Sequence, residues 1–272
     1  MVELALAQTV VGDDKAANLA ALRTAMRGAS GARLVVFPEA SMYHFGRPSD
    51  PLTPFAEDLD GPFVAELREL AAGHKAWILA GMFERIEGSS RVYNTLVLVD
   101  EVGEVRDTYR KVHLYDAFGF RESDRIAAGD GKTLSFEIDD VRFGAVTCYD
   151  LRFPEQMRTL AAGGAEAIVV PAAWLAGPLK EMHLSTLLRA RAIENTVYVG
   201  CADQCTPGYS GNTALFDPLG VTVASAGESP AVVRGAIERE RVSAVRKLNP
   251  SLRNCRPDLY ARWLEREAVA RT

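Results

Sequence analysis

Residues 141–155 read VRFGAVTCYDLRFPE. The apolar residues up to Val146 predict a buried strand, and this pattern stops at Cys148, where polar residues and Pro154 follow. A thiol therefore stands at a strand end and faces a loop. The unperturbed pKa of cysteine is about 8.5, and only the thiolate attacks carbon. Cys148 can act as a nucleophile only if other parts of the chain supply a base and a cation.

The composition is that of an ordinary globular protein. The chain has 272 residues, of which 48% are hydrophobic and 25% charged, so it can bury one sizeable core. The net charge of -5 is small, and both signs are interleaved along the chain. This pattern argues against a nucleic-acid or an anionic-membrane surface and favours a small-molecule partner.

The cysteines indicate a reducing environment. Cys148, Cys201, Cys205 and Cys255 form no CxxC pair, and no histidine lies near them at metal-ligand spacing. We therefore expect free thiols, no metal site and a cytoplasmic protein. The first residues lack the basic segment of a signal peptide, and no stretch approaches the roughly 18 consecutive apolar residues that a membrane span needs. No membrane association is expected.

Two other predicted strands end in ionisable residues. The apolar run Leu34–Phe37 is followed by Glu39, and the strand predicted at Val105–Val112 carries Lys111 near its end, with His113 just beyond. Position alone also fits a solvated strand cap for the carboxylate and a solvent-facing edge for the cations.

Short helical patterns alternate with these strands and predict an α/β fold. One helix is expected to open at Asp60, as its N-cap, and to stop at Gly73. Another is expected over Lys180–Asn195, with Arg191 in its apolar stripe, where a guanidinium needs a buried partner. In a layered fold of sheets and helices, several strand ends can meet along one edge.

Three segments, in this order, resemble the signature segments of the nitrilase superfamily of carbon–nitrogen hydrolases: Phe37-Pro38-Glu39, Tyr109 to Leu114, and Cys148 to Glu155. The resemblance extends over nearly the whole chain. Further segments similar to the family are Phe120–Ser123, Arg189–Asn195, Asp217–Gly220 and Arg256–Tyr260.

The resemblance implies a four-layer αββα sandwich that pairs into at least a homodimer. The chain shows no internal repeat, linker or composition shift, so residues 1–272 are expected to form a single domain, in which about 245–272 are a C-terminal tail that is frayed or packs on a partner subunit. The family's Glu-Lys-Cys triad needs no metal and no organic cofactor.

The resemblance also implies a role for each candidate residue. Glu39 would accept the proton of the Cys148 thiol and later activate water, while Lys111 would stabilise the thiolate and the oxyanion. The backbone N–H of Tyr149 would be the second oxyanion donor. Glu122 would lie beside Lys111 or the substrate and position them.

The residues after the nucleophile favour an amide substrate. True nitrilases of the superfamily typically have Cys-Trp-Glu there, whereas Cys148-Tyr149-Asp150 resembles branches such as the omega-amidase-like and deaminated-glutathione-amidase-like proteins. A second candidate is an N-carbamoyl amine or amino-acid hydrolase. A nitrilase and a non-catalytic binding relative fit less well.

Several individual assignments stay open at the level of the sequence. Arg152 matches an arginine that faces the substrate carboxylate in the carbamoylase branch, or it pairs with Asp150 or Glu155. Trp174 walls the pocket or belongs to the core. His113 is a competing base for a Cys-His arrangement, although two residues beyond Lys111 on a strand it would lie about 6 to 7 Å further along. Specificity is expected in the loops His44–Leu52 and Leu175–Met182.

Overall fold

The computed structural model describes residues 1–270. Its first sheet has seven strands in the order β13-β1-β2-β3-β4-β5, with β6 paired to β4. These strands are β1 (Val2–Gln8), β2 (Leu34–Val36), β3 (Trp77–Glu84), β4 (Val92–Val99), β5 (Val105–Arg110), β6 (Ile126–Ala127) and β13 (Ala231–Ile237). The second sheet has six strands in the order β12-β11-β10-β9-β8-β7. They are β7 (Leu134–Ile138), β8 (Val141–Ala145), β9 (Ala167–Ala172), β10 (Tyr198–Asp203), β11 (Ala214–Phe216) and β12 (Thr222–Ser225).

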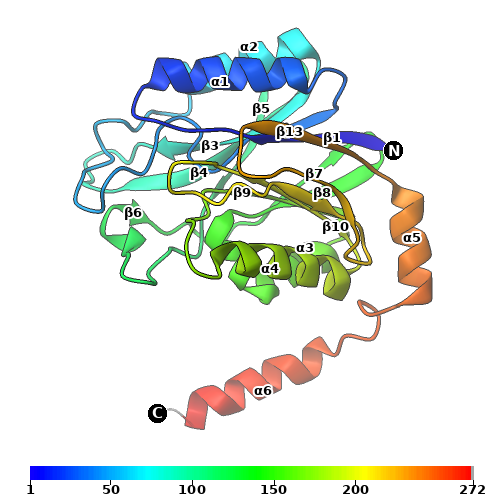
Figure 1. The fold of residues 1–272 in the computed structure, drawn as a ribbon. Helices are drawn as coiled ribbons and strands as arrows, with labels where there is room; N and C mark the ends of the chain where they lie inside the picture. The colour runs from blue at the N-terminus through cyan, green and yellow to red at the C-terminus, as the bar shows by residue number, and fades with distance from the viewer. Residues whose placement is uncertain (271–272) are drawn as a thin grey trace.

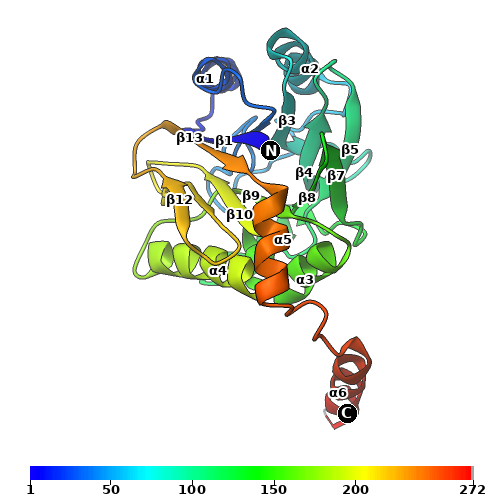
Figure 2. The ribbon, with the colours of Figure 1, turned by 90° about the vertical axis from the view of Figure 1, so that its right-hand side faces the viewer.

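Helices cover the outer face of each sheet (Figure 1). On the first sheet lie α1 (Lys15–Gly28) and α2 (Pro62–His74), and on the second lie α3 (Pro154–Ala162) and α4 (Lys180–Asn195). The predicted four-layer αββα sandwich is confirmed. The chain continues into α5 (Arg239–Leu248), beside the layers, and α6 (Pro257–Ala270), which projects away from them (Figure 2). None of the described helices is long and apolar enough to cross a bilayer.

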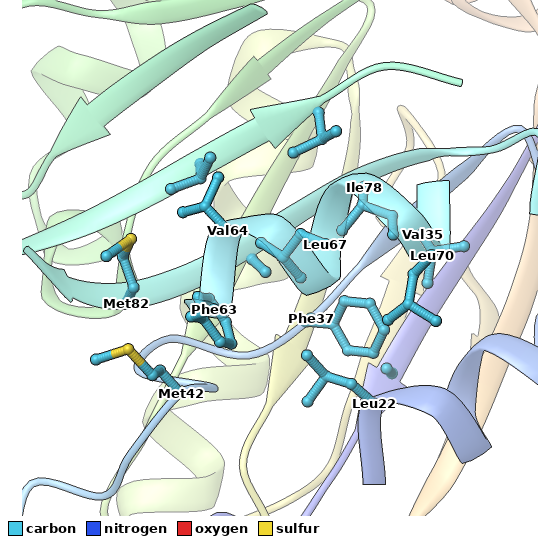
Figure 3. Close-up of a cluster of buried hydrophobic side chains, with 14 of the residues drawn as sticks. Leu22, Val35, Phe37, Met42, Phe63, Val64, Leu67, Leu70, Ile78 and Met82 are labelled. Carbon is cyan, nitrogen blue, oxygen red and sulfur yellow. The ribbon is translucent and has the colours of Figure 1, made fainter. Parts of the chain in front are cut away.

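Three apolar clusters hold the layers together. One lies between the first sheet and its helices and contains Leu22, Phe63 and Ile78 (Figure 3). A second lies between the two sheets, and a third lies between the second sheet and α3 and α4. The strands read as continuous apolar runs because both of their faces are buried: in β9, Val169 joins the middle cluster while Ile168 and Val170 join the outer one.

Two local predictions about α2 were wrong. Its N-cap residue is Gly61 rather than Asp60, and the Phe63 N–H donates to Glu57 Oε2 at 2.7 Å. A carboxylate from outside the helix thus does the work of an N-cap side chain. The helix also continues past Gly73 to His74, and its C-cap residue, Lys75, has a left-handed φ of 53°.

The topology directs the strand ends that matter to one edge. β2 runs parallel to β1 and β3, and β8 runs parallel to β9, which is parallel to β10. The two sheets meet at this edge, where Thr9 after β1 forms a bridge with Gln204 after β10. Gln204 Nε2 also donates to the backbone carbonyl of Glu39 at 2.8 Å. The residues that follow β2, β5 and β8 therefore lie close together.

Candidate active site

A buried ammonium group between two carboxylates forms the centre of the site. Lys111 Nζ lies 2.9 Å from Glu39 Oε1 and 3.0 Å from Glu122 Oε2. The three residues are at most 7% exposed. Lys111 directly follows β5, and Glu122 begins the short 3-10 helix Glu122–Asp124, so the two come from both ends of one irregular segment.

Further donors hold both carboxylates in place. Asn94, in the middle of β4, donates through Nδ2 to Glu39 Oε1 at 2.7 Å and to Glu122 Oε1 at 3.3 Å. The other oxygen of Glu39 accepts the N–H of Ala173 at 2.8 Å. Because each oxygen of Glu39 has a fixed donor, its side chain has one orientation, with Oε1 toward Lys111.

Cys148 opens a 3-10 helix, Cys148–Arg152, directly beyond β8. Its φ of 45° is left-handed, which is strained for a residue with a side chain. The turn is held by two hydrogen bonds: the Thr147 N–H donates to Asp150 Oδ2 at 2.9 Å, and the Asp150 N–H donates to the Thr147 carbonyl at 2.9 Å. Within residues 1–270 the N–H of Tyr149 donates to no protein acceptor, so it is free to bind an oxyanion.

Burial and charge set the proton affinities of the thiol and the ammonium. Burial raises the pKa of Cys148 well above its ordinary value, Glu39 raises it further, and Lys111 opposes both. Burial alone would lower the pKa of Lys111, but Glu122 and Glu39 outweigh it and raise that pKa. The resting site therefore holds a neutral thiol beside a charged ammonium.

A pocket opens onto these groups and includes every residue predicted for the site. Glu39, Lys111, Glu122 and Cys148 line it, together with Tyr149, Arg152 and Trp174. The two loops expected to carry specificity contribute Phe45, Gly46 and Pro48 from one side and Leu175 and Lys180 from the other. The remaining lining residues are Tyr115, Phe120, Arg121, Arg125, Ala173 and Tyr209.

Arg152 is an unpaired cation in this pocket. Its guanidinium lies 4.9 Å from the centroid of the Trp174 ring, and its Nε and Nη2 are buried without a hydrogen-bond partner in the described chain. It pairs with neither Asp150 nor Glu155 among the described residues, so these two alternatives are wrong. Buried guanidinium donors without acceptors suit a ligand that carries an anionic group.

His113 does not face the pocket. Its ring stacks on Phe153 with centroids 3.7 Å apart, and its Nδ1 lies 2.8 Å from Asp150 Oδ1. The premise that His113 lies two residues beyond Lys111 on a strand was wrong, because β5 ends at Arg110 and the chain has already left the strand. A Cys-His pair is therefore not supported by the geometry.

Arg191 lies in the apolar stripe of α4 and has the buried hydrogen-bond partner that its guanidinium needs. Its Nε donates to the carbonyl of Leu151 at 3.0 Å and its Nη1 to Glu194 at 3.0 Å. α4 thereby supports the turn that carries Cys148.

Several site residues were missed by sequence reasoning. Asn94 interrupts the apolar run of β4, and a buried amide in such a run is a usable signal. Lys180 opens α4, donates to Tyr115 OH at 2.8 Å and lies 3.5 Å from the centroid of the Phe118 ring. Nothing in the sequence distinguishes it from a surface lysine.

The family model and the named relatives indicate the same protein family. The sequence model of the carbon–nitrogen hydrolase family matches residues 3–247. The deaminated glutathione amidase of Escherichia coli O157:H7 is 39% identical over 244 residues, which are 89% of this chain and 92% of that protein. The deaminated glutathione amidase of Rattus norvegicus is 34% identical over 86% of this chain and 75% of its own length.

Solved structures agree with the family match. A mutant of the Nesterenkonia AN1 amidase from the nitrilase superfamily has a TM-score of 0.83 at 25% identity, covering 96% of this chain and 97% of that one. A superfamily protein from Xanthomonas campestris, with an arsenic adduct in its active site, has a TM-score of 0.84 at 29% identity, covering 94% and 97%. From residue 3 to residue 247, the chain belongs to the carbon–nitrogen hydrolase family.

Proposed function

We propose that this carbon–nitrogen hydrolase is an amidase that cleaves a small amide through a thioester on Cys148. The observation that carries the proposal is the ammonium of Lys111, held between Glu39 and Glu122 in the pocket that also contains the Cys148 thiol. A nucleophile, a base and a fixed cation are the parts that acyl transfer needs.

Each group has one task in the first half of the reaction. The sulfur of Cys148 adds to the amide carbonyl while its proton passes to Glu39. The oxyanion that forms is stabilised by Lys111 and the free N–H of Tyr149, and one such donor contributes about 3 to 4 kcal/mol. The C–N bond then breaks, and Glu39 returns its proton to the leaving nitrogen.

The second half releases the acid. Glu39 takes a proton from water, the hydroxide oxygen adds to the thioester carbonyl, and the C–S bond breaks with return of a proton to sulfur. Glu122 accepts no proton in this scheme: it shares the charge of Lys111 and accepts the N–H of Tyr115 at 2.5 Å. These groups suffice without a metal or an organic cofactor.

The substrate class follows from relatives and from Arg152. Relatives named deaminated glutathione amidase support an amide substrate, and the unpaired donors of Arg152 support one that bears a carboxylate. Trp174, stacked beside the guanidinium, would form the wall of this subsite. An N-carbamoyl amino acid would satisfy Arg152 equally well, and its hydrolysis would release carbon dioxide together with ammonia.

Assembly and location are part of the same proposal. The described chain leaves an apolar strip exposed along α4 and the turn after β11, including Ile193, Leu219 and Val221, and α6 exposes Tyr260 and Trp263. We assign these surfaces to a second copy of the chain, so that residues 1–272 form one domain whose tail, from about 245, packs on the partner. Four free cysteines fit the reducing cytoplasm.

The test measures product release from deaminated glutathione, small amides, N-carbamoyl compounds and nitriles. Cys148→Ala and Glu39→Gln should each abolish turnover, whereas His113→Ala should leave the chemical step largely intact. A correctly folded but inactive His113→Ala enzyme, or an active Glu39→Gln enzyme, would refute the assigned roles. Preference for N-carbamoyl compounds, with carbon dioxide among the products, would select the second candidate.

A further inference from the structure

Two of the groups assigned to the reaction come from different sheets. Lys111 follows β5, the edge strand of the first sheet, and Cys148 follows β8 in the second. Within residues 1–270 no hydrogen bond joins Lys111 directly to Cys148. The distance between ammonium and sulfur must therefore be fixed by other contacts between the two segments.

The carboxylate of Asp150 makes those contacts. Its Oδ1 accepts the His113 N–H at 3.0 Å and lies 2.8 Å from His113 Nδ1. Its Oδ2 accepts the Tyr109 hydroxyl at 2.6 Å and the Thr147 N–H at 2.9 Å. Three donors thus come from residues two positions before and two positions after Lys111, and the fourth comes from the residue before Cys148.

The Asp150 carboxylate and two of its partners are shielded from water, while His113 at the edge of the network is partly exposed. Asp150 and Thr147 are 0% exposed and Tyr109 is 1% exposed. The Tyr109 hydroxyl also accepts from Gln156 Nε2 at 2.7 Å, which ties it to α3. A buried carboxylate with four donors has one low-energy position, because each lost donor leaves an unsatisfied charge.

We propose that Asp150 is a positioning residue, which sets Lys111 at the right distance from Cys148 by joining residues 109–113 to the turn at 147–150. Asp150 does not line the pocket, so it touches no substrate. This inference rests on the proposed function, because it assigns Asp150 to the geometry of that reaction. A misplacement of about 1 Å between reacting groups costs about 100-fold in rate.

Asp150→Asn tests the link between residues 109–113 and the turn at 147–150, because asparagine has nearly the same shape as aspartate. The amide has one acceptor oxygen, so its NH2 group must face either the His113 donors or the Thr147 N–H. We expect kcat to fall about 100-fold with KM within threefold of wild type. The matched control is Asp217→Asn: that carboxylate is 8% exposed, accepts Leu219 N–H and Arg241, and lies at the far end of its sheet. It should lower thermal stability and leave kcat unchanged.

Tyr109→Phe is a second, milder variant, which removes one of the hydrogen-bond donors to Asp150. We expect kcat about tenfold below wild type with KM again within threefold. Asp217→Asn should not show this fall in kcat at nearly constant KM. The proposal is overturned if folded Asp150→Asn matches the kcat of Asp217→Asn, or, should Asp150→Asn not fold, if Tyr109→Phe has wild-type kcat. Turnover by Cys148→Ala would instead refute the proposed function, so the two failures are distinguishable.

Discussion

At the scale of single residues, the charge around Cys148 decides how the thiol can be activated. Two carboxylates and one ammonium leave the buried site with a net negative charge before the thiol ionises. Burial and Glu39 raise the pKa of Cys148 more than Lys111 lowers it. A stable thiolate is therefore disfavoured, and the proton must leave during attack, to Glu39.

The raised pKa of Cys148 predicts how the resting thiol titrates. The difference in thiolate ultraviolet absorbance between wild type and Cys148→Ala should be absent at pH 7 and should grow only above about pH 8.5, the ordinary thiol value. The sign follows because a raised pKa keeps the proton on sulfur at neutral pH. A thiolate signal already present at pH 7 would instead indicate a preformed ion pair, as in Cys-His enzymes.

At the scale of elements, β3 fixes the backbone that carries Glu39. A side chain at Gly81 would place its Cβ 2.4 Å from the Ala40 nitrogen and 2.8 Å from Glu39 Cα. Backbone cannot yield cheaply there, since Ala40 already has a left-handed φ of 51°. The close approach of β3 to the segment after β2 thus requires glycine.

Gly81→Ala should displace Glu39 and lower both stability and activity. We expect kcat to fall by about 100-fold or more, and the unfolding midpoint to drop. Gly73→Ala is the matched control, because its Cβ meets nothing within 4 Å and its position in α2 favours alanine by about 0.5 to 1 kcal/mol. Normal kcat in folded Gly81→Ala would show that β3 does not hold Glu39.

Most helices and strands could be predicted from the sequence because the spacing of their apolar residues matches the positions that are buried in the fold. The interval of α4 was predicted correctly, and Leu34–Phe37 was rightly expected to be a buried strand. The N-cap of α2 could not be predicted, because its acceptor, Glu57, lies outside the helix. Such contacts depend on tertiary structure rather than local sequence.

The candidate site was likewise predictable only in part: residues within sequence motifs could be identified, and contacts that depend on tertiary structure could not. Glu39, Lys111 and Cys148 were identifiable because each lies at the end of a predicted strand and within a motif. Asn94 in β4 and the N–H of Ala173, directly after β9, orient Glu39, and a backbone N–H has no sequence signature. Asp150 stood out in the sequence only as part of the segment that favours an amide substrate, because its hydrogen bond with Tyr109 spans the two sheets and only the fold reveals it.

At the scale of the whole molecule, α6 projects away from the layers of sheets and helices and does not cover them (Figure 1). Trp263 is 53% exposed there, and Leu248 at the end of α5 is 80% exposed. Large apolar side chains on a projecting helix are costly in water and are typical of a segment that packs on another subunit.

We expect sedimentation to show a dimer at micromolar concentration and removal of 257–272 to weaken it. Ile193→Asp, on the exposed strip of α4, should weaken the dimer as well, because it would bury a charge at the interface. Glu69→Ala, at an exposed position of α2 on the other sheet and outside both the strip and the tail, is the control and should leave the mass unchanged. A monomeric wild-type protein would refute the assignment of these surfaces to a second copy.

The most direct test of the proposed thioester mechanism is to trap the acyl group on Cys148. The enzyme is mixed with a turned-over amide, quenched in acid within one turnover, and digested for mass spectrometry of the peptide that contains Cys148. We expect a mass increase equal to the acyl group on that cysteine, and its loss when hydroxylamine is added before the quench, with formation of the hydroxamate. Rapid turnover with Cys148 unmodified, and no hydroxamate formed, would contradict it.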